Sequence, residues 1–226
     1  MHSIPTLHYD PGLEHRSVRA ALIWGLGLSG CPETASPPLY MSGLLERVRA
    51  AGKEFLHSER KAAVRNMLRF GAYKPSGRSK PSSEYLLASA LEDRFPLVNG
   101  PVDVNNAISL QWGYPASIFD MELCGTRLML RRGTAGENYV FNLSGQIIDL
   151  KDLLCVCRAE GSFWLPCGNP VKDAMATKIR ESTRNVAAVL YAPASEECAE
   201  LEAAAGRFAT LLSTECGAAQ TGWTIP

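Results

Sequence analysis

The sequence predicts an α+β fold, in which packed helices lie against a mixed, largely antiparallel sheet. The chain has 226 residues, of which 46% are apolar and 20% charged, so it can bury a substantial core. Apolar residues recur at helical spacing in its first half, whereas residues 127–156 alternate in short segments separated by glycines. Strands and helices do not alternate regularly along the chain, which disfavours a doubly wound parallel sheet.

In the first half, residues 1–15 contain turn-forming residues and are expected to be an irregular lead-in. An apolar strand is expected near Arg19–Leu28, before a loop rich in proline and glycine. Ser42 is expected to cap an amphipathic helix, and a second helix is expected over Ser58–Phe70. A basic, turn-rich loop then precedes a helix over Ser83–Glu92, which Ser82 is placed to cap.

In the second half, the spacing of apolar residues predicts a helix over Val102–Trp112. Short strands are then expected at residues 128–131, 139–143, 146–148, 155–157 and 186–191. A closing amphipathic helix is expected over Ser195–Ser213, with Glu196 and Glu197 in its first turn. We therefore expect residues 1–59 to be a lead-in within the same globule, residues 60–192 the main domain, and residues 193–226 a helix and tail.

Composition argues against several classes of protein. The 23 basic and 23 acidic residues cancel, so net charge alone attracts neither nucleic acid nor membrane. No apolar run approaches the roughly 20 residues of a membrane span, and the N-terminus lacks the features of a secretory signal. The seven cysteines have no zinc-binding spacing. We therefore expect a cytoplasmic protein with reduced thiols, without a metal or another cofactor.

Charge is nevertheless segregated along the chain. Between residues 60 and 83 there are seven basic residues and no acidic one before Glu84: Arg60, Lys61, Arg65, Arg69, Lys74, Arg78 and Lys80. This pattern has two interpretations. The segment is either a solvated helix face or a surface for a phosphate backbone, where basic side chains release condensed counterions.

Common catalytic motifs are absent: the sequence has no Walker loop, G-x-G-x-x-G, G-x-S-x-G or H-E-x-x-H. All four histidines lie in the first quarter of the chain, away from its polar clusters. A histidine general base is therefore not expected.

The first polar cluster runs from Asn99 to Asn106 and includes Asp103 and Asn105. Its structural interpretation is a turn followed by a capped helix start. Its functional interpretation is a set of amide and carboxylate groups that hold an ester and a water beside exposed backbone N–H groups. Asp120 is isolated in an apolar context, so it is either a buried hydrogen-bond hub or a pocket residue.

The second polar cluster spans residues 166–173 and is followed by Lys178. It is either a polar turn after a strand or a glycine-containing wall that lets the backbone approach a ligand. In the second interpretation, Lys172 and Lys178 reach phosphates.

The run PVDVNNAISLQWGYPASIFDMELCGTRLMLRRGTAGENYVFNLSG and the later GNPVKDAMATKIRESTRNVAAV together resemble the B3/B4 editing domain of the bacterial phenylalanyl-tRNA synthetase β chain. In both, Pro-Val-x-Asp-Val-x-Asn, a later proline and Phe-Asp, and Gly-Glu before a strand occur in the same order. The stretch KPSGRSKPSSEYLL is similar to stand-alone members, so the resemblance covers about Arg60–Tyr191. No aminoacylation core accompanies it.

The resemblance implies a hydrolase that removes the wrong amino acid from a mischarged tRNA, acting in trans. Tracing the motifs, and adding the basic segment, gives three sets of expected site residues. The catalytic set is Asp103, Asn105, Asn106 and Asp173. The substrate-binding set is Asn99, Asp120, Gly168, Asn169 and Lys172. The tRNA-binding set is Arg65, Arg69, Lys74, Arg78, Lys80 and Lys178. The expected partner is tRNA, with no DNA or membrane partner.

The expected substrate differs from that of the synthetase. There an acid in the glycine-rich segment faces the tyrosine hydroxyl, whereas this chain has Gly168 and Asn169, which disfavours tyrosyl-tRNA. Stand-alone relatives are associated with other mischarged tRNAs, including arginine tRNA carrying canavanine, and a cationic side chain would suit an acidic pocket. Two alternatives stay open: a noncatalytic tRNA- or amino-acid-binding module, and a hydrolase of free small esters or amides.

Overall fold

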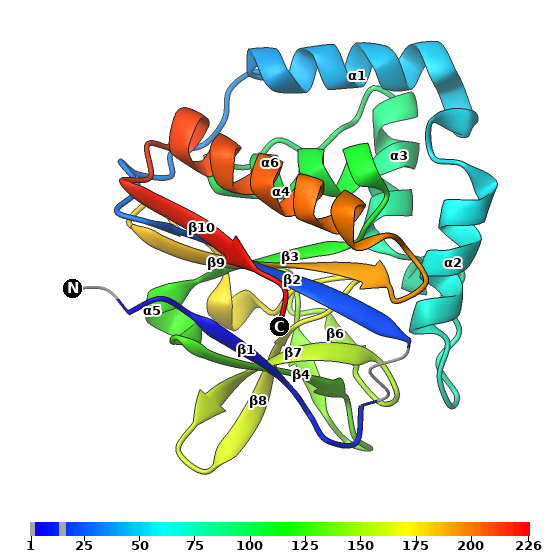
Figure 1. Ribbon diagram of the computed structural model, residues 1–226, viewed down its shortest axis with the longest axis vertical. Helices are drawn as coiled ribbons and strands as arrows, with labels where there is room; N and C mark the ends of the chain where they lie inside the picture. Colours follow the sequence, from blue (N-terminus) through cyan, green and yellow to red (C-terminus); the bar gives the residue numbers. More distant parts are fainter. Residues whose placement is uncertain (1–2, 14–16) are drawn as a thin grey trace.

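The computed structural model describes residues 3–13 and 17–226 (Figure 1). Its helices are α1 (Leu39–Ala51), α2 (Ser58–Leu68), α3 (Ser82–Leu91), α4 (Gly100–Trp112), α5 (Met121–Cys124) and α6 (Cys198–Cys216). Its strands are β1 (Thr6–Tyr9), β2 (Val18–Leu26), β3 (Ala116–Asp120), β4 (Arg127–Arg132), β5 (Asn138–Val140), β6 (Ile147–Asp149), β7 (Leu154–Glu160), β8 (Phe163–Gly168), β9 (Asn185–Pro193) and β10 (Gln220–Thr224). Short 3-10 turns lie at Gly52–Phe55, Gly77–Ser79 and Met175–Thr177.

Two four-stranded sheets and a layer of helices form three layers (Figure 1). The strand order is β10-β2-β9-β3 in the central sheet and β1-β4-β7-β8 in the outer one. Strand β9 is buried on both faces: Val186, Ala188 and Leu190 pack with α4 and α6, whereas the alternate residues Ala187 and Val189 pack with the outer sheet. The period of two along a strand therefore divides β9 between two cores.

Antiparallel pairing dominates both sheets, and β1 with β4 is the parallel pair among the named strands. The predicted α+β class with a mixed, largely antiparallel sheet is thus confirmed. A separate hairpin, β5–β6, stands beside the sheets. Helices α1, α3 and α4 share a further core that includes Met41, Leu44 and Leu86, which fixes the start of α3 beside α4. No helix of the described residues is both long and apolar enough to cross a bilayer.

The ends of the chain differ from the sequence-based expectation. Residues 6–9 form β1 by pairing with β4, whereas the sequence predicts an irregular lead-in over residues 1–15. Residues 1, 2, 14 and 15 of this lead-in lie outside the described part. The expected C-terminal tail contains β10, which adds to the edge of β2. Both segments gain backbone hydrogen bonds from distant strands, and such partners leave no local signal in the sequence.

Two helix starts also differ. Helix α1 begins at Leu39 after Pro38, and Ser42 lies inside it, where its hydroxyl donates to Pro38 O at 3.3 Å. Helix α6 begins at Cys198, so Glu196 and Glu197 precede it, and Glu196 pairs with Arg60 at 3.1 Å. A distant ion partner therefore holds Glu196.

Helix α3 starts one residue before its expected position. Ser82 is its first residue rather than its cap, and the Ser82 hydroxyl is buried without a hydrogen-bond partner among the described residues. The backbone N–H of Ser82 donates to Pro170 O at 2.8 Å, which ties the start of α3 to the loop after β8.

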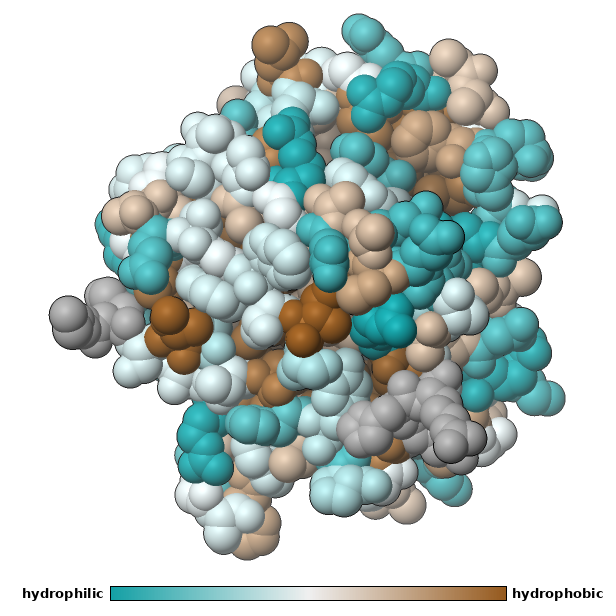
Figure 2. All heavy atoms as spheres, viewed as in Figure 1, coloured by the Kyte–Doolittle hydropathy of each residue, from teal (hydrophilic) through white to brown (hydrophobic). Residues whose placement is uncertain are grey.

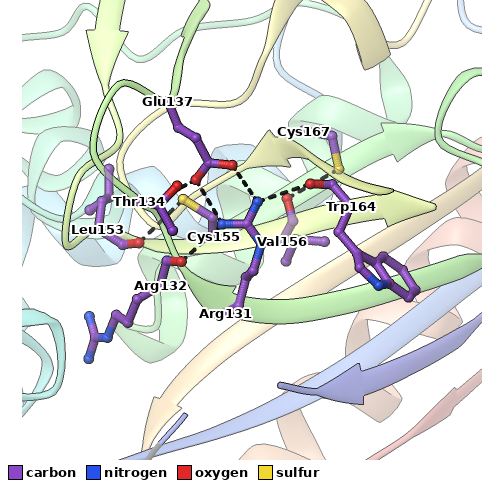
Figure 3. A network of polar contacts seen from close by, with 9 residues as sticks. All are labelled: Arg131, Arg132, Thr134, Glu137, Leu153, Cys155, Val156, Trp164 and Cys167. Carbon is purple, nitrogen blue, oxygen red and sulfur yellow. Dashed lines mark hydrogen bonds and ion pairs between the residues drawn. The ribbon is translucent and has the colours of Figure 1, made fainter. Parts of the chain in front are cut away.

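A partly buried ion pair fixes the loop that leads into the β5–β6 hairpin (Figure 3). Both carboxylate oxygens of Glu137 accept from the guanidinium of Arg131, at 2.8 and 2.5 Å, and Thr134 N donates to Glu137 at 2.7 Å. Arg131 also donates to Trp164 O at 2.9 Å. The bidentate geometry therefore joins the hairpin loop to β4 and β8 in one orientation.

Candidate functional site

A cavity of about 250 Å³ lies where α4, β3 and the loop after β8 meet. Helix α4 contributes Asn105 and Asn106, β3 contributes Ala116 and Ile118, and the loop contributes residues 169 and 171–173. The cavity is smaller than the roughly 300–1,000 Å³ of pockets for drug-sized ligands, so its size suits a single small group.

The cavity opens on an unpaired sheet edge, because β3 is the last strand of the central sheet. Tyr191 N donates to Pro115 O at 3.0 Å, and bonded pairs alternate along an antiparallel ladder. The backbone groups of Ala116 and Ile118 therefore point away from β9. Ile118 N uses this freedom to donate to Asp173 Oδ2 at 3.1 Å.

Asp173 places a buried carboxyl group at the cavity. Its Oδ1 is inaccessible to solvent and has no hydrogen-bond partner among the described residues, although other parts of the residue retain some exposure. Burial raises the pKa of Asp173, whereas the Ser117 side chain and the Ile118 N–H lower it. Burial is the larger effect, and the resulting pKa is about 7. This carboxyl group therefore exchanges a proton near neutral pH.

Asn169 organises the loop that carries Asp173. Its Oδ1 accepts from Val171 N at 2.8 Å and from Lys172 N at 2.9 Å, while its Nδ2 donates to the Tyr139 hydroxyl. That hydroxyl donates to Lys172 O at 2.6 Å. The loop is thus held from within by Asn169 and from the β5–β6 hairpin by Tyr139.

The two neighbouring amides of α4 leave hydrogen-bonding capacity at the cavity. Asn105 Oδ1 is buried and has no partner among the described residues, and Asn105 Nδ2 has one long contact, of 3.5 Å, to Asn106 Oδ1. Because a buried polar atom without a partner costs free energy, a ligand that supplies one is favoured here.

Asn99 and Asp103 do not line the cavity. Asn99 caps α4, where its Oδ1 accepts from Val102 N at 3.2 Å. Asp103 is completely buried, and its Oδ1 accepts from Val98 N at 2.8 Å. Burial raises the pKa of Asp103, and the Thr34 side chain and Val98 N–H lower it. Both side chains thus have structural partners at the start of α4.

Asp120 is likewise absent from the cavity wall. One carboxylate oxygen accepts from Glu122 N at 2.9 Å and caps α5, and the other accepts from the Thr183 hydroxyl at 2.6 Å. Of the two interpretations from the sequence, the structure shows the contacts of the hydrogen-bond hub.

A second, wider hollow of about 670 Å³ adjoins the cavity, and we call it the mouth. The two share Tyr85, Val171, Lys172, Asp173 and Lys178 as lining residues. Its basic residues are Arg78, Lys80, Lys172 and Lys178. The Lys172 ammonium lies 3.9 Å from the centre of the Phe141 ring. Burial and the nearby Arg78 lower the pKa of Lys172.

The other expected tRNA-binding residues lie farther along the surface. Arg65 and Arg69 line a hollow beside α2. Helix α2 lies on the side of the molecule where hydrophilic residues gather (Figures 1 and 2). Glu84 borders both this hollow and the mouth, and it accepts from Arg65 Nε at 2.6 Å. Lys74 is exposed in the loop before α3. Basic residues therefore extend from the mouth to α2, with Arg65 already paired.

Tyr85, Tyr139 and Phe141 are site residues that the sequence analysis did not single out. Tyr85 precedes the buried pair Leu86 and Leu87, so helical spacing places it on the outer face of its helix. Tyr139 lies in β5, and Phe141 directly follows the last residue of that strand. Their meeting with the loop after β8 depends on tertiary packing.

Among the described residues, no histidine or cysteine lines this cavity. The described histidines His8 and His57 are not among its lining residues, whereas His2 and His15 lie outside the described part. Cys155 and Cys157 are buried in β7, in agreement with the predicted strand. The described residues contain no cluster of three or more His, Cys, Asp or Glu side chains suited to a metal ion.

The B3/4 domain family model matches residues 70–212, which is more than half of the chain. The chain therefore belongs to the B3/4 domain family. A solved structure similar to it is an N-terminal fragment of the phenylalanyl-tRNA synthetase β-subunit from Pyrococcus horikoshii, with 10% sequence identity and a TM-score of 0.48. The alignment covers 99% of this chain and 52% of that fragment. No protein with a curated description matches the chain.

Proposed function

We propose that this protein is an aminoacyl-tRNA deacylase that acts in trans on mischarged tRNA. The observation that carries the proposal is the shared wall of two adjoining hollows, one small and lined by amides and a carboxyl group, the other wide and basic. One ligand with an amino-acid head and a phosphate backbone matches both. Membership of the B3/4 family supports a tRNA-related module.

The proposed reaction is the addition of water to the carbonyl carbon of the ester. The bond from that carbon to the ribose oxygen then breaks, and the proton from water reaches the ribose oxygen, which gives free amino acid and tRNA. The Asn105 and Asn106 amides border the cavity and offer N–H donors to an oxyanion. With a pKa of about 7, Asp173 suits the orientation or deprotonation of water at neutral pH.

The proposed amino acid has an arginine-like side chain, with arginine tRNA carrying canavanine as the specific candidate. The support is Asp173, whose buried Oδ1 has no partner among the described residues and could pair with a guanidinium-type group. Such a cation would favour the ionised carboxylate. With this amino acid Asp173 holds the side chain in place of activating water, and the neighbouring amides and the ribose hydroxyl serve the ester.

The test is a panel of tRNAs, each charged with a correct or an incorrect amino acid, including arginine tRNA charged with canavanine. Purified wild-type protein is expected to release the amino acid from a mischarged member, and faster than the spontaneous rate. Binding across the panel without loss of the ester would contradict the deacylase and favour a noncatalytic module. Equal turnover of a free amino-acid ester would favour a small-ester hydrolase instead.

A further inference from the structure

Tyr85 stands at the junction of the cavity and the mouth and lines both. It is 63% exposed, although its helix neighbours Leu86 and Leu87 are buried in the core of α1, α3 and α4. The bond from Ser82 N to Pro170 O anchors its helix to the loop after β8. None of the hydrogen bonds between described residues uses the Tyr85 hydroxyl. A fixed backbone thus presents an open aromatic ring.

An isolated exposed aromatic residue is ordinary on a protein surface, so the surroundings of Tyr85 decide its meaning. Arg78, Lys80 and Lys178 line the mouth with it. The acids of this hollow are Glu84 and Asp173, and Glu84 is paired with Arg65. Burial raises the pKa of Asp173 to about 7. The mouth is therefore positively charged around an aromatic ring.

The second aromatic residue of the mouth is already occupied on one face. Phe141 carries the Lys172 ammonium 3.9 Å from its ring centre, whereas no cation lies over Tyr85 among the described residues. An aromatic platform beside several cations is the combination that proteins use for unpaired nucleic acid, because every base has a face to stack and each linkage has a phosphate to neutralise.

We propose that Tyr85 stacks against the unpaired 3′-terminal base of an RNA, while the cations of the mouth contact its phosphates. This site rests on the proposed function, because a base stacked at the junction directs the ester on its ribose into the adjoining cavity. The ligand class is then a single-stranded RNA end. A double helix would keep its terminal base paired and would leave Tyr85 without a partner.

The experiment uses an uncharged RNA oligonucleotide with 2-aminopurine as its unpaired 3′-terminal base, since stacking quenches the fluorescence of this analogue. Titration with wild-type protein is expected to quench the signal. Tyr85→Phe keeps the ring and should keep the quench. Tyr85→Leu keeps apolar bulk without a ring and should lose the quench and bind about tenfold more weakly or worse. Phe163→Leu is the matched control, because Phe163 is 72% exposed on β8 and does not line the mouth.

The proposal is overturned if Tyr85→Leu quenches and binds the oligonucleotide as wild type does, with its melting temperature as a check that each variant is folded. Deacylation of the charged panel is a separate readout. If wild-type protein hydrolyses a panel member but Tyr85→Leu quenches the oligonucleotide as wild type does, the base site is rejected and the deacylase is retained. A quench that depends on Tyr85, without hydrolysis of any panel member, would support the base site and reject the deacylase.

Discussion

Gly168 lies directly against the carboxyl group of Asp173, five residues further along the chain. A Cβ atom at Gly168 would stand 2.5 Å from Asp173 Oδ1 and 2.4 Å from Cε1 of Phe119. Phe119 is completely buried, so the ring has little room to retreat. The absence of a side chain at Gly168 is therefore what lets the buried carboxyl group approach the end of β8.

We expect Gly168→Ala to lower the free energy of unfolding by about 1–3 kcal/mol, because overpacking forces the ring or the loop to move. Deacylation should fall as well, since the displaced atom belongs to Asp173. Gly43→Ala is the control: it has nothing within 4 Å of the added Cβ and lies in helix α1, where alanine is favoured. Urea unfolding and single-turnover hydrolysis measure the two effects. If Gly168→Ala is as stable as wild type, the close approach of Asp173 and Phe119 to Gly168 is contradicted.

Asp173→Asn should separate catalysis from folding. The pKa of a carboxyl group of this type is about 3.9 in an unfolded chain, whereas that of native Asp173 is about 7. Between these values the native state binds more protons, so wild-type stability falls as pH rises. Asparagine does not titrate. We expect the melting temperature of the variant, relative to wild type, to increase from pH 4 to pH 7.

The same variant should lose deacylation at least ~10-fold, which corresponds to about 1.4 kcal/mol of transition-state stabilisation. Asp103→Asn is the comparison. The sequence suggested a catalytic role for both residues, but Asp103 does not line the cavity, so its variant should keep the rate and alter stability alone. A wild-type rate in Asp173→Asn would remove this carboxyl group from the reaction.

The basic residues of the mouth should contribute to RNA affinity through phosphates. In Arg78→Ala/Lys80→Ala/Lys178→Ala, the slope of log K against log salt should fall by about 0.7–0.9 for each phosphate that the protein no longer neutralises. The effect should be similar for all tRNAs, because phosphates carry no sequence information. Lys53→Ala/Lys151→Ala removes two exposed charges elsewhere and should leave the slope unchanged. If the triple variant has the same slope as the control variant, the basic residues of the mouth form a solvated surface and do not contact phosphates.

The ion pair of Glu137 with Arg131 should stabilise the hairpin in a pH-dependent way. Burial raises the pKa of Glu137, but Arg131 and the Thr134 N–H together lower it by more than burial raises it. The net shift of the pKa is therefore downward. The stabilisation is present above the unfolded value of about 4.3 and is lost as pH falls through the lower native value. Glu137→Gln should cost about 1–3 kcal/mol at pH 7. Its difference from wild type should shrink in acid, as measured by urea unfolding at several pH values.

The sequence predicted the strongly periodic elements well and their ends less well. The helix over residues 102–112 and the strand over residues 186–191 were confirmed, because alternation or helical spacing of apolar residues is a local property. Strands β1 and β10 were missed. Each is held by pairing with a strand more than 100 residues away in sequence, and no local pattern encodes that partner.

For the site, the sequence named Asn105, Asn106, Asn169, Lys172 and Asp173, and the structure places all five around one cavity. It grouped Asp103 with them because short polar residues cluster at one helix start. At about 100° per residue, Asp103 lies on the opposite side of the helix from Asn105 but within about 60° of Asn106, one turn nearer the helix start, where Val98 N and the Thr34 side chain engage its carboxylate. Which of these directions meets the cavity depends on the elements packed around the helix, and the local sequence does not encode it.

The sequence by itself determined the fold class, the family resemblance and the basic segment, because periodicity, motif order and charge are written along the chain. The tertiary structure alone decided which polar residues meet. Burial at the edge of β3 gives Asp173 its raised pKa, and the approach of the hairpin brings Phe141 to Lys172. The packing of α3 against the loop after β8 sets Tyr85 at the mouth. These are long-range contacts, and their geometry arises only when the layers pack.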